Sequence, residues 1–304
     1  MDFMIWVEDK AHIEYFSRSM AALITPPQWT NVDIKCTSGP DPLSVMTSND
    51  ERIPYCPPEK VAQQPYDIIL IVAGEAGKKR AAEIRKKLCG LGLDESCFLF
   101  DFVAIAPGFS WGKYQKLKRA KVSILSFNCF GGFLSHSLAL PFRSPTVNMF
   151  FNEDEYVRML RYPRLYLRET LEYEKDGWEE SLKIKYPIYR LGDILVYMNH
   201  YPDYQEAEKK WYERVRRINW YNLFVVMYTE RQEILERFDA LPFAKKVCFV
   251  PFSSSLDSAW QIDKTATGKE LPLWDAVNHF GMGKPWSYDP FDMLLYGKKT
   301  IVRS

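Results

Sequence analysis

Lys-Val-Ser-Ile-Leu-Ser-Phe-Asn-Cys-Phe-Gly-Gly, residues 121–132, is the stretch from which the fold prediction starts. Its pattern predicts a short buried strand over 122–126, a polar turn with two glycines, and a helix over 133–140. Open α/β sheets bind ligands where strands end, against the N-terminus of the next helix. We therefore predict a site in this turn, formed by Asn128, Cys129, Gly131 and Gly132.

Strand and helix patterns alternate on both sides of this stretch. The strongest strand pattern, 66–72, is continuously apolar, as expected for a central parallel strand covered on both faces. Further strands are predicted at 3–7, 31–36, 97–105, 147–151, 194–198, 223–227 and 246–252, and helices at 9–23, 77–91 and 204–218. The alternation predicts an α/β fold of two Rossmann-like domains, with mainly parallel sheets and helices on both faces. The Ala106-Pro107-Gly108 turn predicts domains at 1–108 and 109–304.

The first domain lacks the glycine pattern of a dinucleotide site. The first strand is followed by Glu8-Asp9-Lys10-Ala11-His12, without Gly-x-Gly-x-x-Gly, so the backbone cannot close on a pyrophosphate. We therefore predict a structural or partner-binding role for this domain instead of an NAD site.

Composition narrows the classes of partner. The chain has 304 residues and a formal net charge of +1, which argues against bulk attraction to nucleic acid or membranes. No apolar run reaches the ~18 residues of a membrane span, and the acidic N-terminal flank does not fit a signal peptide. The six cysteines contain no Cys-x-x-Cys and predict reduced cytoplasmic thiols. We predict no nucleic-acid partner, no transmembrane segment and no metal; cofactors and the oligomeric state are unknown from sequence.

Four motifs occur in order in the second domain. They are Ser126-x-Asn128-Cys129-x-Gly131-Gly132, Ser144-Pro145-Thr146, His200-Tyr201 and Ala207-x-x-x-Trp211-x-x-Arg214-x-x-Arg217-Ile218-Asn219. Together they resemble a bacterial family of unknown function, domain of unknown function 1919, over roughly residues 110–252. The family pattern favours Trp where this chain has Phe130. Its members are often labelled exopolysaccharide biosynthesis proteins, so the resemblance implies an association with cell-surface polysaccharide synthesis.

Cys129 and His200 are the predicted catalytic pair. A cysteine before a helix N-terminus is expected to have a lowered pKa, and His200 is placed to act as a base. If strands 122–126 and 194–198 are parallel neighbours, both residues lie at one edge of the sheet. The alternatives are that Cys129 packs as a small apolar group and that His200 hydrogen-bonds the turn before Asp203.

The other predicted site residues would hold a ligand. The N–H groups of Gly131 and Gly132 suit an anion, although a tight turn also requires such glycines. Arg214 and Arg217 suit the diphosphate of a nucleotide sugar, or else are solvated charges paired to Glu213. The full set of predicted ligand-binding residues is Asn128, Gly131, Gly132, Ser144, Tyr201, Trp211, Arg214, Arg217 and Asn219.

Three functional hypotheses stay open. The first is a sugar-group or glycosyl transferase of surface-polysaccharide synthesis that uses a nucleotide sugar, although the chain has no Asp-x-Asp element for a metal-dependent version. The second is a non-catalytic sugar-binding or assembly protein. The third is an acyltransferase or hydrolase that depends on Cys129. The sequence does not decide between them, or whether the protein is an enzyme.

Overall fold

A computed structural model describes residues 1–8, 33–41, 45–46, 52–180, 183–265, 268–278 and 288–301. The chain divides into two compact units. Unit 1 contains Met1–Gln115 and His136–Pro141, and unit 2 contains Lys116–Ser135 and Phe142–Ser304. Each unit holds a parallel sheet with helices, which confirms the mixed α/β class. The helix predicted at 9–23 lies outside the described residues, and the boundary predicted after residue 108 stays a prediction.

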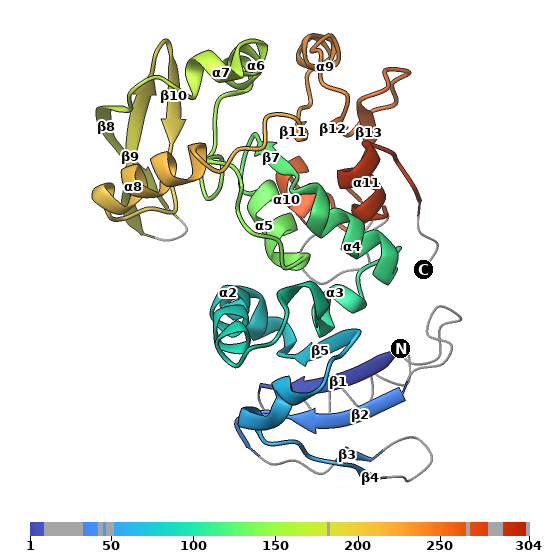
Figure 1. The fold of residues 1–304 in the computed structure, drawn as a ribbon. Helices are drawn as coiled ribbons and strands as arrows, with labels where there is room; N and C mark the ends of the chain where they lie inside the picture. The colour runs from blue at the N-terminus through green and yellow to red at the C-terminus, as the bar shows by residue number, and fades with distance from the viewer. Residues whose placement is uncertain are drawn as a thin grey trace. The chain divides into compact units, whose positions relative to one another are not determined.

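Unit 1 is built around four parallel strands. Its elements are β1 (Asp2–Val7), β2 (Asp33–Ser38), β3 (Val45–Met46), β4 (Arg52–Ile53), a 3-10 helix (Pro58–Gln63), β5 (Ile68–Val72), α2 (Gly74–Gly90), a 3-10 helix (Glu95–Cys97), β6 (Phe98–Phe100), α3 (Asp101–Ala104) and α4 (Trp111–Ala120), which continues past Gln115. The strand order is β2-β1-β5-β6, and all three pairings are parallel. Figure 1 shows β1 between β2 and β5. β5 is buried throughout and paired on both sides, as its apolar pattern predicts.

The strand predicted at 97–105 is wrong in its second half, because β6 ends at Phe100 and α3 follows at once. The Asp101 carboxylate accepts hydrogen bonds from the N–H groups of Phe102 at 2.8 Å and Gly74 at 2.9 Å. It thus satisfies the first turns of two helices, α3 and α2. This buried carboxylate stops the extended pattern that the apolar residues alone would continue.

Unit 2 contains a second four-stranded parallel sheet, with strand order β13-β12-β11-β7. Its strands are β7 (Ser123–Ser126), β11 (Leu223–Tyr228), β12 (Lys246–Val250) and β13 (Ala259–Gln261). The first three confirm predicted strands, whereas β13 has no counterpart in the prediction. β7 is an edge strand, so one side of its backbone needs partners from outside the sheet.

A three-stranded antiparallel sheet in unit 2 corrects the prediction. It contains β8 (Glu172–Glu179), β9 (Ile184–Leu191) and β10 (Ile194–Tyr197), and it is separate from the parallel sheet (Figure 1). The predicted strand 194–198 is therefore not a parallel neighbour of β7. Only Gly192 and Asp193 separate β9 from β10, and such a short turn joins antiparallel strands. Gly192 has a φ of 64°, a conformation that glycine favours.

The helices that belong wholly or partly to unit 2 also revise some bounds. They are α5 (Phe130–Ser137), α6 (Glu153–Arg161), α7 (Pro163–Tyr166), α8 (Tyr204–Val215), α9 (Gln232–Asp239), α10 (Leu273–Asn278) and α11 (Pro290–Tyr296). α5 begins directly after Cys129 and not at the predicted residue 133. α8 confirms the predicted Asp203 cap, which accepts from the N–H of Glu206 at 2.9 Å. The strand predicted at 147–151 is only an isolated bridge between Phe150 and Tyr197.

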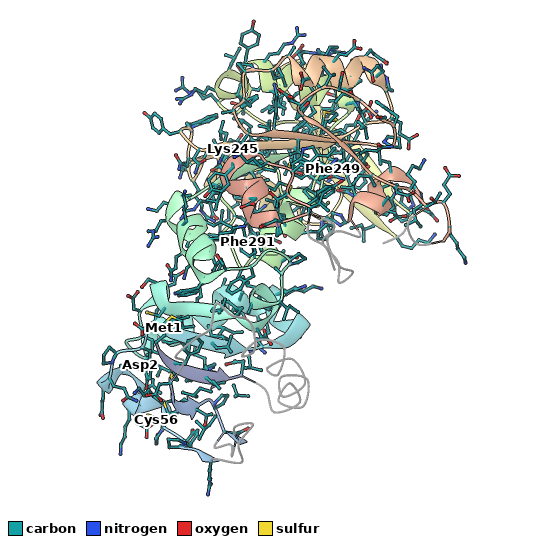
Figure 2. The ribbon with its side chains drawn as sticks, turned by 90° about the vertical axis from the view of Figure 1, so that its right-hand side faces the viewer. Met1, Asp2, Cys56, Lys245, Phe249 and Phe291 are labelled. Atoms are coloured by element: carbon teal, nitrogen blue, oxygen red, sulfur yellow. The ribbon has the colours of Figure 1, made fainter. Side chains whose placement is uncertain are left out.

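Lys245, just before β12, holds the end of α11 (Figure 2). Its ammonium donates to the Leu294 carbonyl at 2.9 Å and to the Asn222 side-chain oxygen. Gly297 ends α11 with a φ of 65°, and a Cβ atom there would lie 3.1 Å from Lys245 Cα. Burial lowers the pKa of Lys245 to about 8. The Lys245 ammonium thus fixes the end of α11, although burial disfavours its charged form.

We predict that Lys245 makes protein stability rise with pH above neutrality. Its folded pKa of about 8 lies below the ordinary 10.5, so the unfolded chain binds more protons between these values. As the pH rises from about 8 to about 10.5, the unfolding free energy of the wild type should therefore increase by about 1–3 kcal/mol relative to that of Lys245→Met. Urea unfolding at several pH values measures the difference, with Lys246→Met as the adjacent control. A difference that does not change with pH would contradict the assignment.

Candidate functional site

Hydroxyl groups hold the carboxyl end of β7. The N–H of Ser126 donates to Thr146 Oγ1 at 2.9 Å, and Ser126 Oγ accepts from the N–H of Gly131 at 3.1 Å. Ser144 Oγ lies 3.0 Å from Thr146 Oγ1 and accepts from the Thr146 N–H at 3.2 Å. These bonds satisfy the open side of β7 and fix the first turn of α5. Ser144 is buried and its hydroxyl is hydrogen-bonded within the chain, so its predicted ligand-binding role stays a prediction.

Gly131 and Gly132 let α5 pack closely. A Cβ atom on Gly131 would lie 2.8 Å from Ser126 Cβ and 3.0 Å from Ile124 Cγ2. Both N–H groups are already used, because Gly131 donates to Ser126 Oγ and Gly132 donates to the Cys129 carbonyl at 3.0 Å. The structure therefore favours close packing over the predicted backbone anion site.

Cys129 is half-buried directly before α5. Burial raises the pKa of its thiol to about 12, and the charge of Glu179 acts in the same direction. Backbone hydrogen bonds at Cys129 and Met149 oppose the shift without cancelling it. The expectation of a lowered pKa is therefore wrong, because desolvation outweighs the helix N-terminus. The thiol is protonated at neutral pH.

Glu179, the last residue of β8, connects the surroundings of Cys129 and His200, because its charge raises the pKa of both. His200 is exposed, yet desolvation by nearby protein atoms is the larger effect and lowers the pKa of its ring. Asn199 Nδ2 donates to Glu179 Oε2 at 3.4 Å. Among the described residues, no hydrogen bond joins the Cys129 thiol to the His200 ring. The predicted pair shares a neighbouring carboxylate instead.

Arg214 is a buried cation on α8, with 7% of its surface exposed. Its Nη1 donates to Tyr201 Oη at 2.5 Å and to the Val147 carbonyl at 3.4 Å. The guanidinium also lies over the Phe142 ring, 5.2 Å from its centroid. Within the described part of the chain, Nε and Nη2 donate to no acceptor and no carboxylate pairs with the guanidinium, although neither nitrogen is fully shielded from solvent. A cation this buried normally has a counter-charge.

Two more polar atoms lack partners in the same part of the sequence. Asn199 Oδ1 and Trp211 Nε1 are both buried without a hydrogen bond among the described residues. Trp211 precedes Arg214 by three residues, so the two share a face of α8. Asn199 precedes Tyr201, which neighbours both Arg214 and Cys129. Buried polar atoms without partners are uncommon and call for an ion, a ligand or water.

The remaining predicted residues have partners within the chain. Asn128 Oδ1 accepts from the N–H of Phe130 at 3.1 Å. Arg217 is exposed and pairs with Glu213 at 3.3 Å, which matches the solvated alternative. The N–H of Asn219 donates to Ser123 Oγ at 2.8 Å and ties the end of α8 to β7. Arg214 is thus buried and Arg217 is solvated, although the sequence analysis predicts the same ligand-binding role for both.

Three residues of the site have no role in the sequence prediction: Phe142, Glu179 and Asn199. Glu179 lies on β8, whose sequence Glu-Tyr-Glu-Lys-Asp-Gly-Trp-Glu carries little apolar signal. The Gly192-Asp193 turn could have revealed β9 and β10 as a hairpin, because Gly-Asp between two strand patterns is a turn signal.

The fold and the site define a mixed α/β protein with a buried arginine that no carboxylate pairs among the described residues. Within the described residues, no group of three or more His, Cys, Asp or Glu residues is placed to hold a metal ion. None of the helices described is long and apolar enough to span a membrane.

The chain belongs to the family of the domain of unknown function DUF1919, which matches residues 103–296. An uncharacterized protein of Haemophilus influenzae is 33% identical over 186 residues, covering 59% of this chain and 85% of that protein. The family predicted from the motifs is confirmed, whereas its association with exopolysaccharide synthesis stays a prediction.

We predict that Cys129 is alkylated slowly. Its pKa of about 12 leaves little thiolate at neutral pH, whereas Cys89 is exposed. Iodoacetamide at about pH 7.5 should modify Cys89 at least about tenfold faster, as followed by peptide mass spectrometry. Faster reaction at Cys129 would restore the hypothesis of a thiol nucleophile.

We also predict that Gly131→Ala destabilises the protein by about 1–3 kcal/mol, because the new methyl group overlaps Ser126 and Ile124. Gly132→Ala is the matched control, since its nearest contact would be Val147 Cγ1 at 3.3 Å. Urea unfolding should therefore show a smaller loss for Gly132→Ala. Equal losses would mean that close packing at Gly131 is not what fixes α5.

Proposed function

We propose that this protein binds an anionic sugar derivative at Arg214 and acts as a sugar-group transferase in cell-surface polysaccharide synthesis. The observation that carries the proposal is the buried guanidinium of Arg214, whose Nε and Nη2 donate to no acceptor within the described residues. The phosphate of a nucleotide sugar supplies both the missing charge and the missing acceptors. The polysaccharide context comes from the family label that the motifs imply.

Electrostatics favours an anion over a neutral ligand at this position. A buried cation without a counter-charge destabilises the unliganded protein, so an anion that pairs with it recovers part of the desolvation energy. Nη1 is fixed by Tyr201 and Val147, which leaves Nε and Nη2 as a pair of parallel donors. A pair of this kind matches two oxygens of a phosphate or carboxylate. The unpaired Trp211 Nε1 adds a neutral donor on the same helix face.

His200 is the proposed acid–base group. Desolvation lowers the pKa of its ring, so the imidazole is neutral near pH 7 and can accept a proton from a sugar hydroxyl. The nearby charge of Glu179 would stabilise the imidazolium that forms. Cys129 supplies no nucleophile in this proposal, because its thiol is protonated.

The alternative of a non-catalytic sugar-binding or assembly protein uses the same anion site without His200. We further propose a cytoplasmic location and no nucleic-acid partner, in line with the thiols and the net charge of +1. Each parallel sheet with its helices would be one Rossmann-like domain, in unit 2 with the antiparallel sheet as an addition.

The test compares Arg214→Met with Arg217→Met, which removes a solvated charge from the same helical region. Calorimetric titration would use UDP-glucose, GDP-mannose, glucose 1-phosphate and inorganic pyrophosphate. We expect at least one to bind the wild type. Arg214→Met should weaken it by about 10- to 100-fold, the worth of charged hydrogen bonds, and Arg217→Met by less than about threefold.

Folding is controlled separately, because removal of a buried arginine can change stability. Circular dichroism and thermal unfolding of both variants show whether they remain folded. A second readout is the rise in unfolding temperature with phosphate, which should occur in the wild type and vanish in Arg214→Met. The proposal would be contradicted if none of the four compounds binds the wild type, or if Arg214→Met and Arg217→Met lose the same amount of binding affinity. If the wild type binds a sugar compound through Arg214 but transfers no sugar, and His200→Ala binds it equally well, the non-catalytic alternative is favoured.

A further inference from the structure

Large apolar side chains are exposed around α7 in unit 2. Tyr162, directly before α7, is 65% exposed, and Leu165 within it is 60% exposed. The N–H of Leu165 donates to the Tyr162 carbonyl at 2.9 Å, so the two side chains are one helical turn apart and are neighbours. Tyr221, shortly before β11, is 98% exposed. Apolar side chains that gather on a surface mark an interaction site.

A cation–π contact joins α7 to the segment that carries Tyr221. The guanidinium of Arg164 lies over the Trp220 ring, 4.8 Å from its centroid. Arg164 precedes Leu165 in the chain, and Trp220 precedes Tyr221. The exposed side chains of Leu165 and Tyr221 therefore flank one contact.

A hydrogen bond joins the chain after α7 to α8. The N–H of Leu171 donates to the Tyr212 hydroxyl at 3.0 Å. Arg168 precedes Leu171 by three residues, and Arg216 follows Tyr212 by four, on the same side of the helix. Both arginines are exposed. We call the surface formed by these side chains the basic patch: Tyr162, Arg164, Leu165, Arg168, Arg216 and Tyr221.

The arginines of the basic patch have no carboxylate partners. Among the residues that the structure describes, no Asp or Glu lies within salt-bridge distance of Arg164, Arg168 or Arg216. The same holds for Arg161, the exposed last residue of α6. Four guanidiniums on this side of unit 2 are therefore available to an external anion.

The carboxylates near the basic patch do not cancel this charge. Two of them are used by other arginines: the ion pairs are Arg158 with Asp193 and Arg217 with Glu213. Glu172 lies opposite Arg190 in the ladder of β8 and β9. Glu169 lies beside the turn between β9 and β10, where its Cγ would be 3.9 Å from a Cβ atom on Gly192. An excess of positive charge remains even when Glu169 and Glu172 are both counted against the four guanidiniums.

An anionic membrane surface suits each kind of side chain at its own depth. Aliphatic Leu165 would enter the edge of the acyl layer, tyrosines favour the headgroup level, and guanidiniums pair with lipid phosphates. Nucleic acid or free phosphate supplies the anions but no apolar layer for Leu165. A neutral bilayer supplies the apolar layer but no excess negative charge for the arginines. The net charge of +1 gives no field over the whole protein, so the attraction is local to the patch.

We infer that the basic patch binds the surface of a membrane that contains anionic lipids. The inference goes beyond the proposed sugar transfer and does not depend on it, because no residue of the patch is part of the proposed ligand site. Arg214 and Arg216 are only two residues apart, yet Arg214 is buried and Arg216 is exposed.

The experiment measures co-sedimentation of the full chain with lipid vesicles. One set contains phosphatidylcholine alone, and the other contains phosphatidylcholine with about one-third phosphatidylglycerol. We expect the wild type to bind the anionic vesicles at least about tenfold more tightly, and added salt to weaken this binding. The double variant Arg164→Gln with Arg168→Gln should bind them at least about tenfold more weakly than the wild type.

Two further double variants complete the design. Lys79→Gln with Lys86→Gln makes the same change in net charge on exposed residues of α2 and should weaken binding by less than about threefold. Tyr162→Ser with Leu165→Ser keeps every charge and should weaken binding by at least about fivefold, because less apolar surface enters the bilayer. Circular dichroism shows that the variants remain folded.

Other results would overturn the inference. These are equal binding to both kinds of vesicle, equal losses in the arginine and lysine variants, or unchanged binding in Tyr162→Ser with Leu165→Ser. If a single-stranded DNA oligonucleotide binds through Arg164 and Arg168 while vesicles do not, the patch is a nucleic-acid surface instead. Binding of anionic vesicles by a protein that binds no nucleotide sugar would support the patch and contradict only the transferase. Nucleotide-sugar binding without vesicle binding would contradict only the patch.

Discussion

The edge position of β7 is the constraint on which unit 2 depends. An edge strand presents backbone groups that must be hydrogen-bonded if the strand is buried. β7 is buried, and its open side is satisfied by the Thr146 hydroxyl and, just beyond its end, by the N–H of Phe151 donating to the Phe127 carbonyl at 3.1 Å. The segment 144–151 therefore has to run beside β7 although it forms no strand of its own. The motif residues Ser126 and Thr146 form this contact, because the Ser126 N–H donates to Thr146 Oγ1.

The same segment carries the arginine. Val147 follows Thr146, and its carbonyl accepts from Tyr201 Oη at 3.0 Å as well as from Arg214. Tyr201 and Arg214 thus reach the parallel sheet through one carbonyl whose position is set by the bond between Thr146 and Ser126. These hydrogen bonds bring together the motifs 126–132, 144–146, 200–201 and 207–219.

Sequence reasoning succeeds where a local pattern meets a single structural requirement. The apolar run of β5, the Asp203 cap and the strands β7, β11 and β12 are of this kind. It fails where a long-range contact decides. Burial of the Cys129 thiol depends on neighbours such as Met149, and the difference between Arg214 and Arg217 depends on Tyr201 and Val147, which no spacing rule supplies. β8 escapes prediction because most of its side chains are exposed and polar, so the apolar alternation of a strand is missing.

Desolvation explains why the site does not favour a thiol nucleophile. Burial raises the pKa of Cys129 and lowers that of His200, so it favours the neutral form of each. A thiolate–imidazolium pair would have to move a proton from a thiol with a pKa of about 12 to a ring whose pKa lies below its ordinary value. Glu179 stabilises the imidazolium but opposes the thiolate, so it cannot favour the pair as a whole. In the proposed function the guanidinium of Arg214, which no carboxylate pairs among the described residues, is instead the group that an incoming anion neutralises.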